Sequence, residues 1–570
     1  MTQWYNSVMR RVNASIPFLA PMALFTASGA LGLGVAYDLR LSLPWFVSLV
    51  LGVALYAGVA CAPRRRLATV TALMALWCTG YGLLLMVQYR HLGFGTKLGL
   101  AARLGQLTSA PFPDVTPLYI DPNAAASFIA PGLPLIIGLA LVDRGLRRRV
   151  WIAAAVIVSF GVLLTVSRGA FMALAMAGVL WGLVRWQEHA MRRDATGPMP
   201  GRHQWMGAVA ICSLVALGIL AIAGDPRIQR ALDSALFRAE DRLALYRNSL
   251  FLAFEFPFSG IGPGGVFGQM YSRFQLLIVP TFLGYAHNLF LGIWLAQGLL
   301  GLASFAWLLV AAIRRIAPTL RTRDRQQQGA AIACCVILFH GITDAPQYDT
   351  SWPTMILAFG LLAIIAAPAA MPLVAGDQPS RSADVATRAR RGRMGRRLAL
   401  AALVTGLVAF TPHLAAAGAA NYAAILHARA MLAPGLSQDE RAVLMAESIT
   451  WINYGLHLAP GSPLVQKRLG MLALGQGDYP RAIAALERAR VVLGADQATR
   501  KALGLAYVWN GQPLHGARLL AQLDNGAEIR EELETWPYTW EERGRSDLAA
   551  YARQAAQALD TFTPGTGVGP

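Results

Sequence analysis

Residues 43–66, LPWFVSLVLGVALYAGVACAPRRR, join a long apolar run to three consecutive arginines. An apolar run of about 20 residues is long enough to cross the hydrocarbon core of a bilayer as a helix. Arginine clusters are typical of the cytoplasmic ends of such helices. The same alternation of apolar runs and arginine-rich gaps continues through residue 417. It predicts an all-α protein whose first part is a polytopic bundle of membrane helices.

Outward from this stretch, apolar runs of about 17 to 25 residues predict about eleven spanning helices. We expect them at residues 15–37, 43–62, 67–88, 124–142, 149–166, 169–186, 205–224, 286–311, 329–343, 353–375 and 398–417. Basic clusters fill every second gap, at residues 10–11, 64–66, 144–149, 185–202, 314–325 and 381–397. Because such clusters stay in the cytoplasm, the N-terminus is predicted to lie inside and the segment after the last span outside.

The composition supports a membrane protein without a bound metal. Hydrophobic residues make up 55% of the 570 residues and charged residues only 14%, as expected for a membrane bundle. The net charge of +19 lies mostly in the predicted cytoplasmic loops, where it indicates contact with anionic membrane lipids and not with nucleic acid. The five cysteines lack the paired spacing of a zinc site. Carboxylates are scattered over the outer loops, so neither a metal nor another cofactor is expected.

Three segments outside the predicted spans are long enough to hold structure, and all three share the outer face: residues 89–123, 225–285 and 418–570. The last has amphipathic helical patterning and is predicted to be a soluble domain that follows a membrane domain of residues 1–417. Within it, Leu469 and Gly470 recur as Leu503 and Gly504, an offset of 34 residues that is the tetratricopeptide period. We expect a stack of about three helix pairs, which either packs on the membrane domain or binds a protein partner.

Charged residues at the edge of a bilayer are costly and are therefore candidates for function. Arg168, in SRGAF at 167–171, lies between the fifth and sixth spans with almost no loop to carry it away from the membrane. Arg242 and Tyr246 are four residues apart in a segment with the pattern of an interfacial helix, so they share one face. Arg247 and Glu255 interrupt the apolar residues of the same segment.

Two more polar groups mark the outer ends of predicted spans. His287 and Asn288 open the eighth span, and Gly298 follows eleven residues after the histidine. Asp344 follows the ninth span, in FHGITDAPQYDTSW. A histidine and a carboxylate at the same face of the membrane are candidates for proton transfer.

Glycines at 260, 262, 264 and 265 predict a tight turn and not a nucleotide-binding loop, because no strand precedes them. Asn123 comes just before the fourth span. We expect it either to cap that helix or to orient groups in the site, and capping is the favoured interpretation.

Several motifs follow one another over about 180 residues. They are DPNAAASFIAPGLPL at 121–135, SRG at 167–169, Arg242 with an aromatic residue four positions on, PFSGIGPGGVF at 257–267, and HN at 287–288 with its glycine. In this order they resemble the O-antigen ligase and polymerase superfamily, the Wzy and WaaL type of lipid-linked glycan transferases. The resemblance implies a bacterial inner-membrane glycosyltransferase with a GT-C-like bundle and a glycan donor linked to undecaprenyl diphosphate, and the parity of the spans then puts the C-terminal domain in the periplasm. It implies that Arg168, Arg242 and His287 belong to the active site, and it does not extend to the tetratricopeptide-like tail.

The chemistry of these side chains fits that reaction. Guanidinium groups bind phosphate oxygens in a fork and stabilise charge that grows on a leaving diphosphate, so Arg168 and Arg242 receive this role, with Arg247 as a further contact. Histidine has an ordinary pKa of about 6.5, which suits His287 as the base in a metal-independent inverting transfer. Asp344 and Glu255 are rival bases. The remaining candidate substrate contacts are Tyr246, Asn288, Asn123 and Asp344.

Three acceptors stay open for such an enzyme. They are the lipid A core (a ligase), another lipid-linked repeat unit (a polymerase) and a protein hydroxyl (an oligosaccharyltransferase). The spacing from histidine to glycine favours the ligase. A flippase for lipid-linked glycans would carry ionisable groups through the middle of its spans, whereas here they gather at one face. A scaffold protein would explain the repeats but not the three candidate catalytic residues.

Overall fold

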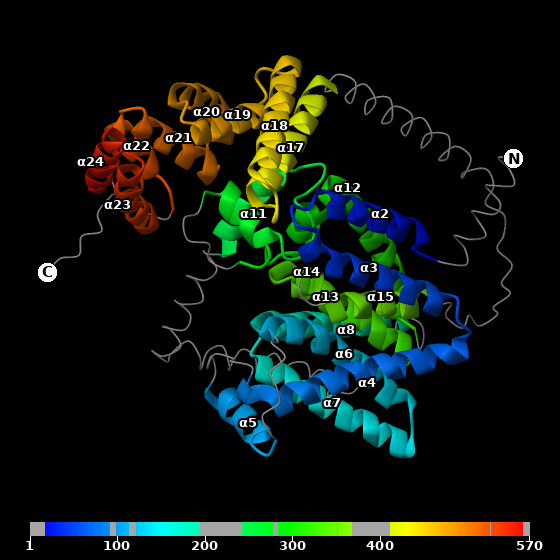
Figure 1. The fold of residues 1–570 in the computed structure, drawn as a ribbon. Helices are drawn as coiled ribbons and strands as arrows, with labels where there is room; N and C mark the ends of the chain where they lie inside the picture. Colours follow the sequence, from blue (N-terminus) through cyan, green and yellow to red (C-terminus); the bar gives the residue numbers. More distant parts are fainter. Residues whose placement is uncertain are drawn as a thin grey trace, which may run out of the picture.

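The computed structural model describes residues 17–91, 99–112, 121–193, 242–276, 283–322, 324–349, 352–367, 411–524 and 526–562. Within these ranges every regular element is a helix and no strand is present (Figure 1). The predicted all-α class is confirmed. The helices form a bundle from residues up to 367 and an arm of mostly shorter helices from residue 411 onward (Figure 1).

Six helices in the described ranges are long and apolar enough to cross a bilayer. They are α3 (Leu39–Ala60), α4 (Arg64–Gln88), α6 (Pro122–Val142), α7 (Gly145–Thr165), α8 (Arg168–Arg193) and α12 (Leu289–Thr319). The bundle also contains α2 (Leu19–Val35), α13 (Arg325–Thr343) and α15 (Trp352–Ala366). These helices coincide with the first six and the eighth to tenth predicted spans, which confirms the polytopic bundle. The predicted span at 205–224, and the part of 398–417 before residue 411, lie outside the described residues.

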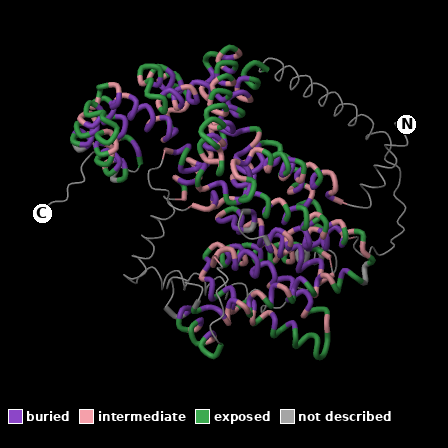
Figure 2. The backbone as a smooth tube through the Cα atoms, viewed as in Figure 1, coloured by how far each residue is buried: buried purple, intermediate pink, exposed green. Residues whose placement is uncertain are grey.

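The outward faces of the bundle are apolar, as a lipid environment requires. Figure 2 shows exposed positions along the outer helices and buried positions where the helices meet. Several large apolar side chains are more than half exposed there: Leu51, Leu73, Val156 and Val179. Soluble proteins rarely expose contiguous apolar surface of this extent, whereas helices that are apolar all round are typical of membrane spans.

Helix α13 occupies the middle of the bundle and packs closely on α6. A Cβ atom added at Gly329 of α13 would lie 2.6 Å from the Pro134 carbonyl oxygen of α6, and one added at Gly138 of α6 would lie 2.5 Å from the Arg325 carbonyl oxygen. Small residues at such crossings let two membrane helices approach until their backbones touch. This close packing fixes the N-terminal part of α13 against α6, and the polar candidates gather at the opposite, C-terminal end of α13.

Helix α12 is broken at Gly298, which has φ 66° and ψ −168°. The turn formed by residues 257–261 fills the break: the Ile261 amide donates to the Leu295 carbonyl at 2.6 Å, and the Leu299 amide donates to the Pro257 carbonyl at 2.9 Å. A side chain at Gly298 would collide with the Phe258 carbonyl, so only glycine fits. The turn therefore fastens the preceding helix, residues 242–255, to α12.

The arm consists of α17 (Thr411–Leu432), α18 (Gln438–Leu458), α19 (Pro463–Gln476), α20 (Tyr479–Leu493), α21 (Gln497–Trp509), α22 (Pro513–Leu520), α23 (Gly526–Glu542) and α24 (Ser546–Phe562). The two predicted repeats make equivalent contacts. A Cβ atom at Gly470 would lie 2.5 Å from Leu486, and one at Gly504 would lie 2.7 Å from Leu520. The tetratricopeptide assignment stays a prediction, and the boundary expected after residue 417 falls inside α17.

Candidate active site

The polar candidates converge on the last turn of α13, Thr343, and the residue after it, Asp344. The Arg242 Nη1 group donates to the Thr343 carbonyl at 2.9 Å, and Arg242 Nη2 lies 4.0 Å from Asp344 Oδ2. The Tyr246 hydroxyl lies 2.9 Å from the carbonyl oxygen of His287 and 3.3 Å from that of Thr343, so its single proton is shared between them. Burial raises the pKa of Tyr246, which keeps this hydroxyl a donor. Arg242 and Tyr246 thus lie on one face, as predicted, and both contact the carbonyl oxygen of Thr343.

His287 pairs with Asp344 at the start of α12. The His287 Nδ1 atom lies 3.0 Å from Asp344 Oδ1, and the two side chains are 22% and 3% exposed. His287 has φ 52°, a left-handed conformation that is costly for a residue with a side chain and is often found at functional sites. Asn288 holds the histidine in place, because its Oδ1 accepts from the Phe290 amide at 3.0 Å and its Nδ2 donates to the Ile342 carbonyl at 3.0 Å.

Asp344 is ionised in this setting. Burial alone would raise the pKa of its carboxyl, but the hydrogen bonds from His287 and Tyr285 and the charges of His287 and His340 hold that pKa below its ordinary value. An ionised carboxylate accepts the Nδ1 proton of His287 and leaves Nε2 as the basic nitrogen. The geometry therefore makes Asp344 the partner that orients His287, a role that the sequence analysis did not assign.

The SRG corner, residues 167–169, packs against the same last turn of α13. Val166 has φ 49°, and it joins the end of α7 to the start of α8 within two residues. Behind Arg168, a Cβ atom at Gly169 would lie 2.9 Å from His340 Cδ2 and 3.2 Å from Thr343 Oγ1. Arg168 itself is exposed at the first position of α8. The candidates Arg168, Arg242 and His287 come from three distant segments and flank one turn.

Three predicted residues have other surroundings. The cap of α6 is Asp121, whose Oδ1 accepts from the Ala124 amide at 2.8 Å, so the capping role favoured for Asn123 was wrong, because Asn123 already lies inside the helix. Arg247 pairs with Asp524 of the arm. Glu255 is 4% exposed and is bound by Lys467 and Arg468. Because these two cations hold its carboxylate, Glu255 is not a rival base, and that alternative was wrong.

The arm docks on the outer segment that carries Arg242. Lys467 Nζ donates to Glu255 at 2.5 Å and also binds Asp496. The Arg468 guanidinium lies 4.5 Å from the centre of the Phe274 ring and reaches Glu255 as well. These cations are 2% and 3% exposed. A sequence signal existed, since two of the three lysines of the chain, at 467 and 501, lie in the arm and both are buried.

Asn421 of α17 joins the arm to the turn in the broken helix. Its Oδ1 accepts from the Phe258 amide at 3.1 Å, and its Nδ2 donates to Ser259 Oγ at 2.8 Å. Together with the cluster around Glu255, this contact makes the arm part of the scaffold that supports helix 242–255.

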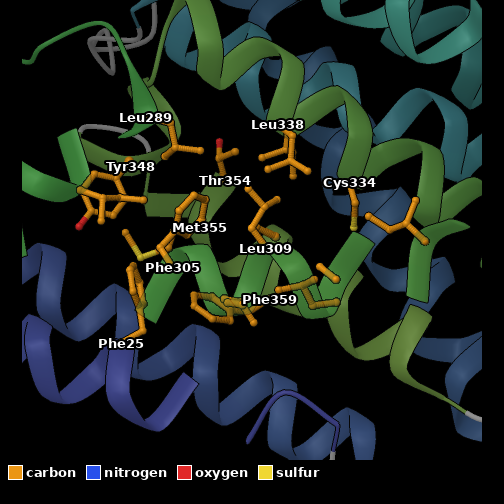
Figure 3. A pocket seen from close by; sticks show the side chains of 17 residues that line it. Phe25, Leu289, Phe305, Leu309, Cys334, Leu338, Tyr348, Thr354, Met355 and Phe359 are labelled. Carbon is orange, nitrogen blue, oxygen red and sulfur yellow. The ribbon is translucent and has the colours of Figure 1, made fainter. Parts of the chain in front are cut away.

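An apolar cavity of about 120 Å³ lies within the bundle next to the site. Figure 3 shows its lining by side chains of α2, α12, α13, α14 (Pro346–Asp349) and α15, with Tyr348 and Cys334 on opposite sides of the view. Leu289 follows His287 by two residues and Tyr348 follows Asp344 by four, so the polar cluster borders one end of the cavity. The lining suits a hydrocarbon chain. In the described ranges no three His, Cys, Asp or Glu side chains are placed to hold a metal, and the expectation of a metal-independent site stays a prediction.

Residues 153–306 match the family model Wzy_C, described as O-antigen ligase. An O-antigen ligase of Salmonella typhimurium (strain LT2) is 28% identical to this chain over 206 residues, which is 33% of this chain and 45% of that relative. The chain thus spans under half of the length of the curated relative that it matches. The family match contains Arg168, Arg242 and His287, whereas Asp344 and the arm lie beyond it.

Proposed function

We propose that the protein is a membrane glycosyltransferase of the O-antigen ligase superfamily, because residues 153–306 match the O-antigen ligase family model and a curated O-antigen ligase is similar to the chain. It moves a glycan from a polyprenyl diphosphate, undecaprenyl diphosphate by analogy with the family, to an acceptor outside the inner membrane. The observation that carries the proposal is the His287–Asp344 pair beside Arg242. A base and a phosphate-binding cation within one cluster are what a displacement at a diphosphate-linked sugar requires.

The proposed reaction is a single displacement. The acceptor hydroxyl attacks the anomeric carbon, and the bond between that carbon and the diphosphate oxygen breaks, so the diphosphate leaves with the electron pair and the anomeric configuration inverts. The hydroxyl proton goes to His287 Nε2, and Asp344 stabilises the imidazolium that forms.

In the proposed reaction the two arginines place positive charge beside the diphosphate, where negative charge develops as it leaves. Arg242 donates one N–H to the Thr343 carbonyl. Its side chain is 42% exposed, so its remaining N–H groups are accessible to a phosphate. Arg168 is exposed on the neighbouring helix end. Guanidinium groups keep their charge near a bilayer and bind phosphate in a fork. The apolar cavity beside the cluster is the proposed location for the first part of the isoprenoid chain.

The orientation belongs to the same proposal. The arginine clusters predict a cytoplasmic N-terminus, and the site and arm then face the periplasm. A donor that is already attached to lipid fits this side, where nucleotide sugars are absent. The family description, O-antigen ligase, favours a ligase, for which the proposed acceptor is the lipid A core. The arm does not decide this choice. Asn288 and Asn123, at the starts of α12 and α6, stay proposed as further substrate contacts.

A complementation experiment tests the proposal. A deletion strain receives wild type, Arg242→Ala or His287→Ala, and its surface glycan is displayed on a gel. We expect both variants to lose polymer attached to lipid A core while lipid-linked polymer is retained. Collapse to single repeat units would instead identify a polymerase. Arg314→Ala and His457→Ala, an arginine at the opposite end of α12 and a histidine of α18, are matched controls, and equal glycan in all four variants would refute the site.

A further inference from the structure

The first turn of α8 lacks the cap that its sequence offers. Ser167 occupies the N-cap position, because its carbonyl accepts from the Phe171 amide at 3.2 Å. A serine in this position normally turns its hydroxyl onto an amide of the first turn. Here Ser167 Oγ is buried and makes no hydrogen bond to any described residue. The amides of the first turn have no acceptor inside the helix, so both the hydroxyl and the helix end are available to another group.

A second buried polar atom beside that turn also lacks a hydrogen-bond partner. His340 is 2% exposed, and its Nε2 has no hydrogen-bond partner among the described residues. A Cβ atom at Gly169 would lie 3.0 Å from this nitrogen. Two buried, unpaired polar atoms so close to one helix end are unusual, because an unsatisfied buried donor or acceptor is costly.

The charge of this corner favours an anion. The N-terminal end of a helix carries partial positive charge and binds phosphate through its amides, and Arg168 adds a full positive charge at the first helical position. Asp344, whose charge acts on His340, is already paired with His287 and Arg242. A hydroxyl, an imidazole N–H and backbone amides are all donors that phosphate oxygens accept.

We propose that Ser167 Oγ, His340 Nε2 and the first-turn amides of α8 form, with Arg168, a binding site for one phosphate group of the donor. This inference rests on the proposed function for the identity of the donor, because the same phosphate chemistry is offered by the headgroup of an anionic phospholipid. Glycine at 169 is required, since any side chain there would displace the His340 ring.

Binding of inorganic diphosphate to the full-length protein tests the site without turnover. The protein is placed in nanodiscs of phosphatidylcholine, and binding is measured by calorimetry. We expect wild type to bind saturably and Ser167→Ala and His340→Leu each to weaken binding about tenfold, the loss of one hydrogen bond to a charged group. Ser167→Thr and His340→Gln keep a donor and should recover most of the affinity.

Two controls and two contrary results complete the test. Ser304→Ala removes a buried hydroxyl that donates to the Gly301 carbonyl. His427→Leu removes a half-buried histidine of the arm whose Nδ1 atom is also buried and unpaired among the described residues. Both should bind diphosphate as wild type does. Unchanged binding in folded Ser167→Ala and His340→Leu would overturn the inference. The inference would also be overturned if binding of phosphatidylglycerol in the nanodiscs, and not binding of diphosphate, were lost in these variants. Failure of the proposed function would appear separately, as retained ligation by His287→Ala.

Discussion

The Nδ1 atom of His287 lies 3.0 Å from Oδ1 of Asp344, although 57 residues separate the two in the chain. The carboxylate is buried and the imidazole is partly open to solvent. A buried carboxylate behind a histidine fixes its tautomer and stabilises its protonated form. The pair gives the candidate base a defined orientation toward the acceptor.

Asp344→Asn is expected to reduce the transfer rate by a factor of about 100 or more, the usual contribution of an oriented general base. The pKa of Asp344 is held below its ordinary value, so the carboxylate is ionised above an ordinary pKa of about 3.9. Titration of Asp344 itself should therefore add no pH dependence to this factor between about pH 5.5 and 8. The rate of glycan transfer to a purified acceptor, measured over this range, checks it. Asp121→Asn, at the cap of α6, is the control, since asparagine caps a helix as well as aspartate.

Gly298→Ala is expected to destabilise the bundle by about 1–3 kcal/mol through its backbone conformation, and by more because the new methyl group meets the Phe258 carbonyl. The displaced turn also carries helix 242–255, so transfer should fall together with stability. Thermal unfolding in detergent measures the first effect. Gly178→Ala on α8, where an added Cβ meets nothing within 4 Å, should leave the melting temperature unchanged or slightly raised. Equal melting of the two variants would contradict the role of the broken helix.

Particular residues show which of these features could be predicted from sequence. Apolar runs are local, so the helices of the bundle followed from residues that are neighbours in the chain. The base and its carboxylate were both singled out, but nothing local joins residue 287 to residue 344. Glu255 was interpreted as a rival base because its partners, Lys467 and Arg468, are 212 and 213 residues away. The break at Gly298 depends on a turn some 40 residues earlier in the chain. The spacing from His287 to Gly298 could be recognised in the sequence, but the neighbouring residues do not show why a glycine is needed there.

The buried cluster around Glu255 predicts non-additive effects. Glu255→Gln removes the carboxylate that pairs with Arg468, and Arg468→Gln leaves Glu255 with Lys467 alone. Breaking a buried ion pair on one side costs about 3–5 kcal/mol. The double variant removes one charge of each sign, so we expect it to lose clearly less than the sum of the two single losses. Limited proteolysis between the bundle and the arm measures the docking. Additive losses would mean that the cluster does not act as a unit.

The same variants test whether the arm supports the active site. Helix 242–255 has Glu255 at one end and Arg242 at the other, so loosening the arm should increase hydrogen exchange along this helix and lower kcat. Arg553→Met, which removes the partner of Glu541 in the last two helices of the arm, serves as a comparison that leaves Glu255 and its partners in place. Normal turnover in a Glu255→Gln protein with a loosened arm would show that the arm is dispensable for chemistry.

Variants of Arg247 test whether this residue binds the substrate or only holds the arm on the outer segment. Its guanidinium pairs with Asp524, and the two side chains are 40% and 52% exposed. An exposed ion pair contributes about 0.2–1 kcal/mol, so Arg247→Ala and Asp524→Ala should change the stability of the docked arm equally and only slightly. If Arg247 also contacts the diphosphate, Arg247→Ala alone should raise KM for the donor, because the loss of one charge-assisted hydrogen bond weakens binding about tenfold or more. Donor titrations on both variants, with Arg314→Ala as an arginine at the far end of α12, distinguish the two roles, and identical KM values in all three would assign Arg247 to the interface with the arm.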